Sequence, residues 1–260
     1  MTMTVTSPSA VRARGARLAA GVYGPINPVY RLSAIGAAVG AALALAIGLT
    51  LHDPVRAALA GLVVAVVGFS AGWRPILDPD VRAALELISD HDCHERAEWK
   101  NETGTSVPRG VAAMRRWLLA HPSGAGRASI LLRLGQLEEA AQAIEAIESS
   151  TPEEAFGVDI LRETRILLTG QTPDLSDLHA SWGSLPDPRE RRHRRECLAL
   201  LDAQIAVDRG ENPGPPLASA RVEIGEVHPS MRAPRLLART MFIAAGVIAV
   251  VAVVSAGVSF

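Results

Sequence analysis

Uninterrupted apolar blocks lie near both ends of this chain. Residues 32–51 form twenty consecutive uncharged positions, which at a helical rise of about 1.5 Å per residue cross a hydrocarbon core of about 30 Å. A second, shorter block follows at 57–73, and a third at 240–260 reaches the last residue. This pattern predicts three transmembrane helices, two in a hairpin near the N-terminus and one at the C-terminus.

Arginines gather on one side of the predicted spans. The flanking arginines are Arg12, Arg14, Arg17 and Arg31 before the first span, Arg74 after the second, and Arg232, Arg235 and Arg239 before the third. Because cytoplasmic flanks retain positive charge, we expect the basic tail 1–31 and residues 74–239 to be cytoplasmic. The arginine-rich, lysine-poor composition is typical of GC-rich bacterial genes, so we expect the membrane to be a bacterial plasma membrane. A signal peptide cleaved near Ala44 is the alternative, although the basic tail is long for one.

Between the spans, residues 74–210 read as successive helices, with no alternating strand pattern. The predicted helices are 79–100, 107–120, 125–134, 137–149, 152–169, 174–182 and 188–209. Four of them start at a capping side chain followed by proline: Asp78, Thr151, Thr172 and Asp187. Residues 211–239 are rich in proline and glycine and are predicted to be a linker to the third span. The expected fold class is therefore all-α.

One stretch, 131–141, resembles the second half of a tetratricopeptide repeat. The matching positions are Gly135 at the turn, Leu137, the small Ala140 and the closing Pro152. Gly170 repeats the turn glycine thirty-five residues later, near the family's period of about 34. The resemblance covers residues 125–210 and implies a helical-hairpin surface that binds peptides or proteins. A compact bundle of antiparallel helices would use the same residues, so both interpretations stay open.

Charge and cysteine content exclude several classes of function. The 26 basic and 27 acidic residues nearly cancel, so no nucleic-acid partner is expected. Cys93 and Cys197 belong to the region predicted to be cytoplasmic, where thiols stay reduced, and we expect both to be free. No ionisable residue lies well inside a predicted span, which disfavours a transporter or pump.

The densest group of chemically capable side chains lies within 90–95. Its candidate metal ligands are His91, Cys93, His94 and Glu95. On a helix, residues four apart share a face, as His91 and Glu95 do and as His94 and Glu98 do, so these pairs could direct two ligands toward one zinc ion. The competing interpretation is a solvated polar helix face, because the sequence shows no matching ligand pair downstream.

A run of arginines opens the last predicted helix of the central region. Its members are Arg189, Arg191, Arg192, Arg194 and Arg195. Such a run could contact anionic lipid headgroups, nucleic acid or an acidic partner, or it could be the exposed, solvated start of a helix. We take these arginines as a candidate interaction surface.

No phosphate-binding loop, Gly-x-Ser-x-Gly elbow, His-Glu-x-x-His helix or kinase motif occurs, so we expect neither an enzyme nor a cofactor. The expected function is a membrane protein whose cytoplasmic helical domain binds or scaffolds a protein partner. The alternatives are a metal-binding enzyme or sensor that uses residues 90–95, and an accessory subunit of a channel or transporter. Small residues four apart, such as Gly36 and Gly40, leave homo-oligomerisation open.

Overall fold

The computed structural model describes residues 7–24 and 79–225, together with five isolated helical positions, Ile35, Ala38, Val39, Ala42 and Ala46. All regular secondary structure in these residues is helical, which confirms the all-α fold class. None of the helices within these residues is both long and apolar enough to cross a bilayer. Apart from the five isolated positions, the three predicted spans lie outside the described residues.

The chain divides into two units, one of residues 1–23 with 86–225 and one of residues 24–85 with 226–260. The first unit, here called the helical domain, holds nearly all described residues. The helices are α1 (Pro8–Tyr23), α4 (Pro79–Thr103), α5 (Val111–Ala120), α6 (Ala125–Leu134), α7 (Leu137–Glu145), α8 (Pro152–Thr169), α9 (Ser176–Ser181), the short 3-10 turn η2 (Trp182–Ser184), α10 (Pro188–Asp208) and α11 (Gly214–Ile224). The predicted helices 125–134 and 152–169 are confirmed at both ends.

Local start and stop signals explain these ends. The Thr151 side chain accepts a hydrogen bond from the Glu154 amide, and the Glu154 carboxylate accepts one from the Thr151 amide, so a capping box begins α8. Gly170 ends α8 in the left-handed conformation, with φ at 95°. Gly135 does the same after α6, with φ at 75°, and allows α7 to turn back against α6. The hairpin brings Ala140 into full burial.

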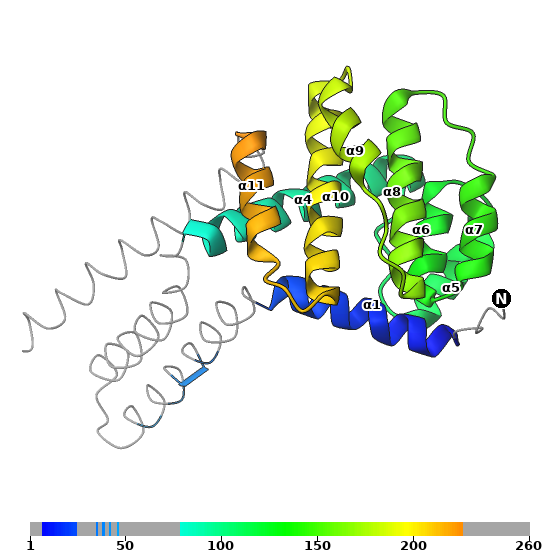
Figure 1. Ribbon diagram of the computed structural model, residues 1–260. Coiled ribbons are helices and arrows are strands. Elements are labelled where there is room, and N and C mark those ends of the chain that lie inside the picture. The colour runs from blue at the N-terminus through cyan, green and yellow to red at the C-terminus, as the bar shows by residue number, and fades with distance from the viewer. Residues whose placement is uncertain are drawn as a thin grey trace, which may run out of the picture. The chain divides into compact units, whose positions relative to one another are not determined.

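The core of the helical domain forms where α1 meets the longer helices. One apolar cluster joins Leu18 of α1 to Leu167 of α8 and Leu198 of α10. A second joins Val11 of α1 to Leu131 of α6. Figure 1 shows α1 crossing one end of α6, α8 and α10, and each of these helices contacts it.

Helix α1 occupies most of the segment that the sequence predicts to be a basic tail. Its arginines bind the C-terminal ends of other helices, because unpaired carbonyls and the helix dipole make those ends negative. Arg12 donates a hydrogen bond to the carbonyl oxygen of Leu134 at 3.1 Å, and Arg14 donates to that of Leu167 at 2.9 Å. Arg14 also pairs with Asp208 at 2.6 Å. These arginines therefore hold the helical domain together, whatever their effect on membrane orientation.

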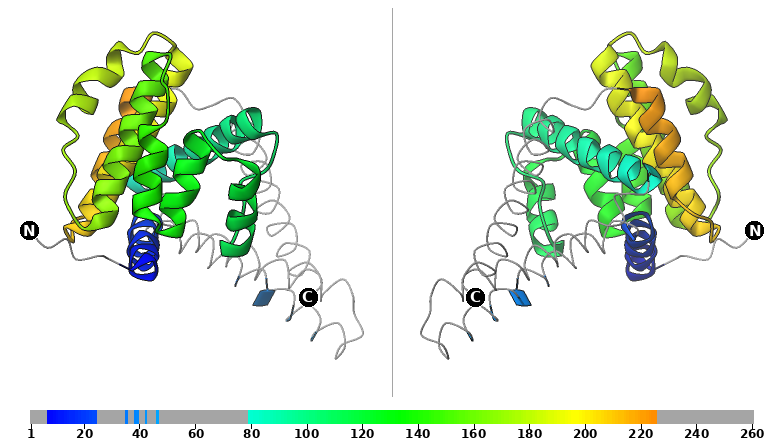
Figure 2. Two further views of the ribbon diagram at one scale, coloured as in Figure 1. Left: turned by 90° about the vertical axis from the view of Figure 1, so that its right-hand side faces the viewer. Right: turned by 90° about the vertical axis from the view of Figure 1, so that its left-hand side faces the viewer.

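Helix α11 replaces the first part of the linker predicted at 211–239. Prolines in its first turn have no amide hydrogen to lose there, so they start the helix rather than break it. Leu217 and Ala220 are buried, and α11 packs alongside α10 (Figure 2). Residues 226–239 lie outside the described residues.

Candidate metal centre between α4 and α10

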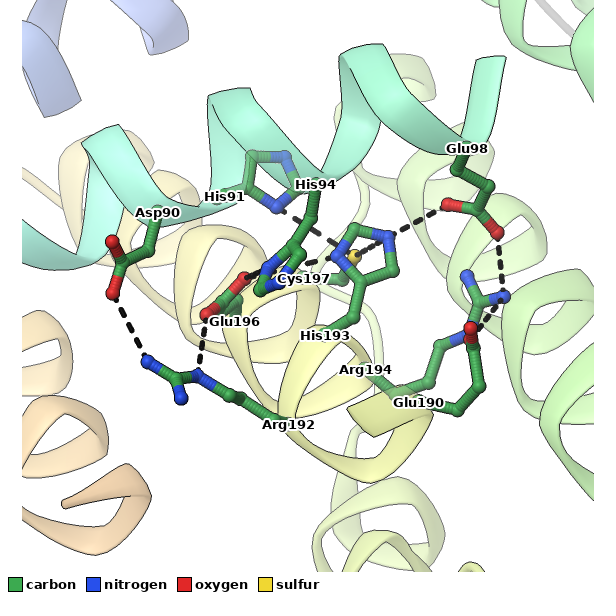
Figure 3. Close-up of polar contacts among 10 residues, drawn as sticks. All are labelled: Asp90, His91, His94, Glu98, Glu190, Arg192, His193, Arg194, Glu196 and Cys197. Atoms are coloured by element: carbon green, nitrogen blue, oxygen red, sulfur yellow. Dashed lines mark hydrogen bonds and ion pairs between the residues drawn. The ribbon is translucent and has the colours of Figure 1, made fainter. Parts of the chain in front are cut away.

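Two helices that begin about a hundred residues apart carry a group of buried and half-buried polar side chains between them. Helix α4 contributes His91, His94 and Glu98, and α10 contributes His193 and Cys197. Residues three and four apart share one face of a helix, so each set points in one direction. Figure 3 shows the two sets facing one another across the α4–α10 contact.

His91, His193 and Cys197 form the first set of possible metal ligands. The Cys197 Sγ atom lies 3.8 Å from His91 Nδ1 and 3.8 Å from His193 Nε2. The two imidazole rings are stacked, with centroids 5.5 Å apart and planes 13° from parallel. Three donor atoms from two helices thus converge on one small volume.

His94, His193 and Glu196 form a second set that shares His193. His94 Nδ1 lies 2.8 Å from Glu196 Oε2, at hydrogen-bond distance. His193 Nδ1 lies 3.7 Å from the same oxygen. The two ring nitrogens of His193 therefore face different acceptors.

Carboxylates and arginines surround both sets. Glu98 Oε2 accepts a hydrogen bond from His193 Nε2 at 2.8 Å, and Glu98 Oε1 accepts one from Arg194 at 2.9 Å. Arg192 lies 3.2 Å from Asp90 and 3.5 Å from Glu196. His193 Nδ1 and Glu196 Oε1 are among the buried atoms of this network that make no hydrogen bond within the described residues. Buried polar atoms usually have a partner, so the network is not fully satisfied by hydrogen bonds between its own side chains.

The histidines change the acidity of the cysteine. Burial alone would raise the pKa of Cys197, but the adjacent His193 and His91 lower it to about 5. Burial alone would lower the pKa of His193, but Cys197, Glu196 and Glu98 raise it well above its ordinary value. The same burial opposes protonation of His91, whose pKa is nevertheless raised by Cys197. Cys197 is therefore a thiolate at neutral pH, the form that binds metals.

The two carboxylates beside His193, the partly exposed Glu98 and the buried Glu196, are held ionised. Burial alone would raise the pKa of Glu98, but the hydrogen bond from His193 and the charge of Arg194 lower it to about 2. For Glu196, burial is outweighed by His193, 3.7 Å away, and by the hydrogen bond from His94, and the pKa falls to about 2. Both carboxylates are therefore negatively charged at neutral pH, and they face the histidines and arginines of the same network.

Of the four ligands predicted within 90–95, the structure brings two into the donor sets. His91 belongs to the first set and His94 to the second. Cys93 belongs to neither set found among the described residues. Glu95 forms an ion pair with Arg133 of α6. The face of α4 alone does not form the site, because the remaining donor atoms of both sets come from α10.

The arginine run at 189–195 is not a uniformly exposed surface. The side chains of Arg192, Arg194 and Arg195 are only 18%, 14% and 6% exposed, and each pairs with acidic residues of the helical domain. Arg191 donates a hydrogen bond to the carbonyl oxygen of Gly183, and Arg189 is exposed. Acidic residues on α4 and α11 draw three of these arginines inward, a long-range pairing that the local sequence does not reveal.

His193, Cys197 and Glu196 are site residues that the sequence does not assign, whereas the spacing of His94 and Glu98 on one helix face already points to Glu98. A signal for two of them is present, because His193 and Cys197 are four residues apart and share a helix face. The arginines around them obscure this signal.

A cavity of about 690 Å³ reaches the first donor set. Its wall includes His91 and Cys197, and apolar residues of α8 and α10 such as Leu161 and Leu201 line other parts of it. A small molecule of ordinary ligand size fits such a volume. Comparison with protein-family models, with curated proteins and with solved structures gives no match.

Proposed function

We propose that this chain is a metal-responsive integral membrane protein, whose helical domain binds a transition-metal ion through His91, His193 and Cys197. The convergence of these three donor atoms is the observation that carries the proposal. A thiolate with two imidazoles selects zinc or another thiophilic metal over magnesium or calcium, which prefer oxygen ligands.

The distances fit zinc with small movements. Zinc bonds of about 2.3 Å to sulfur and about 2.0 Å to nitrogen, at tetrahedral angles, place sulfur and nitrogen about 3.6 Å apart. The two sulfur–nitrogen distances here are both 3.8 Å. Three protein ligands leave a fourth position, which water or a molecule in the adjacent cavity would take.

The first donor set is the better metal site of the two. Glu196 in the second set already accepts a hydrogen bond from His94 and lies 3.5 Å from Arg192, so a metal there would meet a cation beside its ligand. Cys197 instead contacts the two histidines that would themselves become ligands, with Arg194 as a further cation nearby. Glu98 accepts a hydrogen bond from His193 Nε2, the nitrogen that faces Cys197, so this bond would have to break before Nε2 could bind a metal. Glu196, which lies 3.7 Å from His193 Nδ1, is then the carboxylate placed to orient the imidazole.

A metal at this position would join α4 to α10. Helix α4 begins a few residues after the second predicted span, and α10 is central to the apolar core. Metal occupancy would therefore rigidify the helical domain next to its predicted membrane attachment, which favours a sensor over a catalyst. The three predicted spans, with residues 74–239 in the cytoplasm of a bacterium, complete this proposal. A reducing cytoplasm keeps Cys197 available as a thiolate.

Zinc titration of the purified full chain tests the metal site. The expected result is one tightly bound zinc ion per chain, with an affinity that falls more than about 100-fold in Cys197→Ser, because loss of a direct ligand exceeds the 10–100-fold effect of losing an outer partner. Cys93→Ser is the matched control, since Cys93 lies outside both donor sets. Equal zinc binding in the two serine variants would refute the assignment.

A protein-binding role is the second candidate, and the α6–α7 hairpin supports it. Its turn at Gly135, the buried Leu137 and the fully buried Ala140 stand where a tetratricopeptide repeat has its turn and helix-contact residues. Such hairpins present a surface to peptides or proteins.

Crosslinking in native membranes, followed by mass spectrometry, tests this role. The intact protein is compared with a variant lacking residues 79–210. A specific partner that disappears with the deletion is the expected result. Partners unchanged by the deletion, or crosslinks between copies of this chain alone, would argue against the protein-binding role.

A further inference from the structure

All charged side chains in one stretch of the helical domain are basic. Between Thr103 and Leu137 the chain has five arginines and no acidic residue. Two of the five have structural roles. Arg127 donates hydrogen bonds to the carbonyl oxygens of Leu118 and His121, and Arg133 pairs with Glu95.

The other three arginines are Arg109, Arg115 and Arg116. All three are exposed, and none of their side chains forms an ion pair or hydrogen bond with another residue that the structure describes. They lie on α5 and on the loop before it. This segment therefore presents positive charge that the helical domain itself does not neutralise.

Helix α5 also exposes apolar side chains on the same face. Trp117 anchors its inner face, buried against Trp99 and Ile130. On the outer face Leu119 is 87% exposed and Val111 is 43% exposed. Leu119 follows Arg115 by four residues and Arg116 by three, so both arginines neighbour it on the helix surface.

A helix with one buried face and an outer face of arginine and leucine matches the chemistry of an anionic membrane surface. Arginines bind lipid phosphates, while leucine enters the headgroup layer. A single exposed leucine would need no explanation, but Leu119 occurs with a second apolar residue among three unpaired cations. A domain already tethered to the bilayer needs only weak affinity for this contact, because the tether supplies a high effective concentration.

We propose that α5 and residues 104–110 form a docking surface for anionic phospholipid headgroups, with Arg109, Arg115 and Arg116 on the phosphates and Leu119 in the headgroup layer. This inference rests on the membrane attachment in the proposed function, but not on the metal site. Each arginine near an anionic surface contributes about a fivefold preference for that surface. Loss of two therefore reduces docking by about 25-fold.

The test uses the full chain with a single fluorescent label at Ala112→Cys, an exposed position on the outer face, in a Cys93→Ser/Cys197→Ser background. The protein is reconstituted into vesicles of phosphatidylcholine, with or without phosphatidylglycerol, and resistance to carbonate extraction is measured first. The expected result is a blue shift and quenching by brominated lipid in the anionic vesicles only. Both effects should be lost in Arg115→Glu/Arg116→Glu.

Arg189→Glu/Arg209→Glu is the matched control, because it makes the same charge change at exposed positions on α10 and just after it. It should dock like the parent protein. Protein stripped by carbonate would contradict the membrane attachment itself. Retained protein with no response to phosphatidylglycerol, or with a response that both double variants lose equally, would overturn the docking surface and leave the membrane attachment standing.

Discussion

His193 belongs to both donor sets of the candidate metal centre. One of its nitrogens lies 2.8 Å from Glu98 and 3.8 Å from Cys197, and the other lies 3.7 Å from Glu196. A nearly buried imidazole among several anions stays protonated until a metal ion replaces its proton. The neighbours of His193 thus favour a positive charge at this position, supplied by a proton or by a metal.

Tyr23 provides a test of the polar environment next to this centre. Burial, reinforced by the negative charges of Asp92 and Glu95, raises its pKa to about 12, against about 10 for a free phenol. In Tyr30→Phe, Tyr23 is the only tyrosine, and ultraviolet absorption of the phenolate should rise with a midpoint about two pH units above that of the urea-unfolded chain.

The raised pKa of Tyr23 also makes the stability of the fold depend on pH. The folded state keeps the phenol protonated longer than the unfolded state, so the free energy of unfolding should fall as pH rises from about 10 to about 12. Circular dichroism recorded alongside shows whether the helices persist during the titration. A phenolate midpoint near 10 in the folded protein would mean that Tyr23 does not lie beside Asp92 and Glu95 of α4.

At the scale of helices, the sequence predicts the ends of α6 and α8 but does not predict α1 or α11, for physical reasons. The ends of α6 and α8 follow from Gly135, Thr151 and Gly170, which act within a few residues of themselves. Helices α1 and α11 have local start signals, Ser7 before Pro8 in one and first-turn prolines in the other, but the arginines of one favour a basic tail and the prolines of the other favour a linker. Distant partners hold them, such as Asp208 for Arg14 of α1. Such contacts cannot be found from local pattern.

A glycine substitution measures how firmly α1 is held. Gly135 and Gly210 both have φ at 75°, so alanine at either costs about 1 kcal/mol for the left-handed backbone. At Gly135 the new methyl group would also lie 2.4 Å from the backbone oxygen of Pro8, whereas at Gly210 it meets nothing within 4 Å. Overpacking of this kind costs a further amount of about 1–3 kcal/mol.

Urea unfolding of the two variants in detergent should therefore show a larger loss of stability for Gly135→Ala than for Gly210→Ala. Limited proteolysis should also cleave within α1 faster in Gly135→Ala. Equal losses in the two variants would show that α1 does not rest against the α6–α7 turn.

At the scale of the whole molecule, the sequence predicts the all-helical fold but only half of the candidate site. His91 and His94 stand out because polar residues cluster on α4. His193 and Cys197 come from a helix that starts about a hundred residues later, inside an arginine run that suggests a charged surface. Acidic residues elsewhere neutralise part of that run, so the exposed basic surface lies instead on α5. Pairing between distant helices decides both outcomes.

The central claim is that Cys197 binds a metal together with His91 and His193, and the absorption spectrum of the cobalt-loaded full chain tests it most directly. A cobalt–thiolate bond gives a charge-transfer band in the near ultraviolet that nitrogen and oxygen ligands do not give. The account predicts this band at one cobalt per chain in the wild type and in Cys93→Ser, and its loss in Cys197→Ser. A wild-type spectrum without the band, or a band that survives in Cys197→Ser, would contradict it.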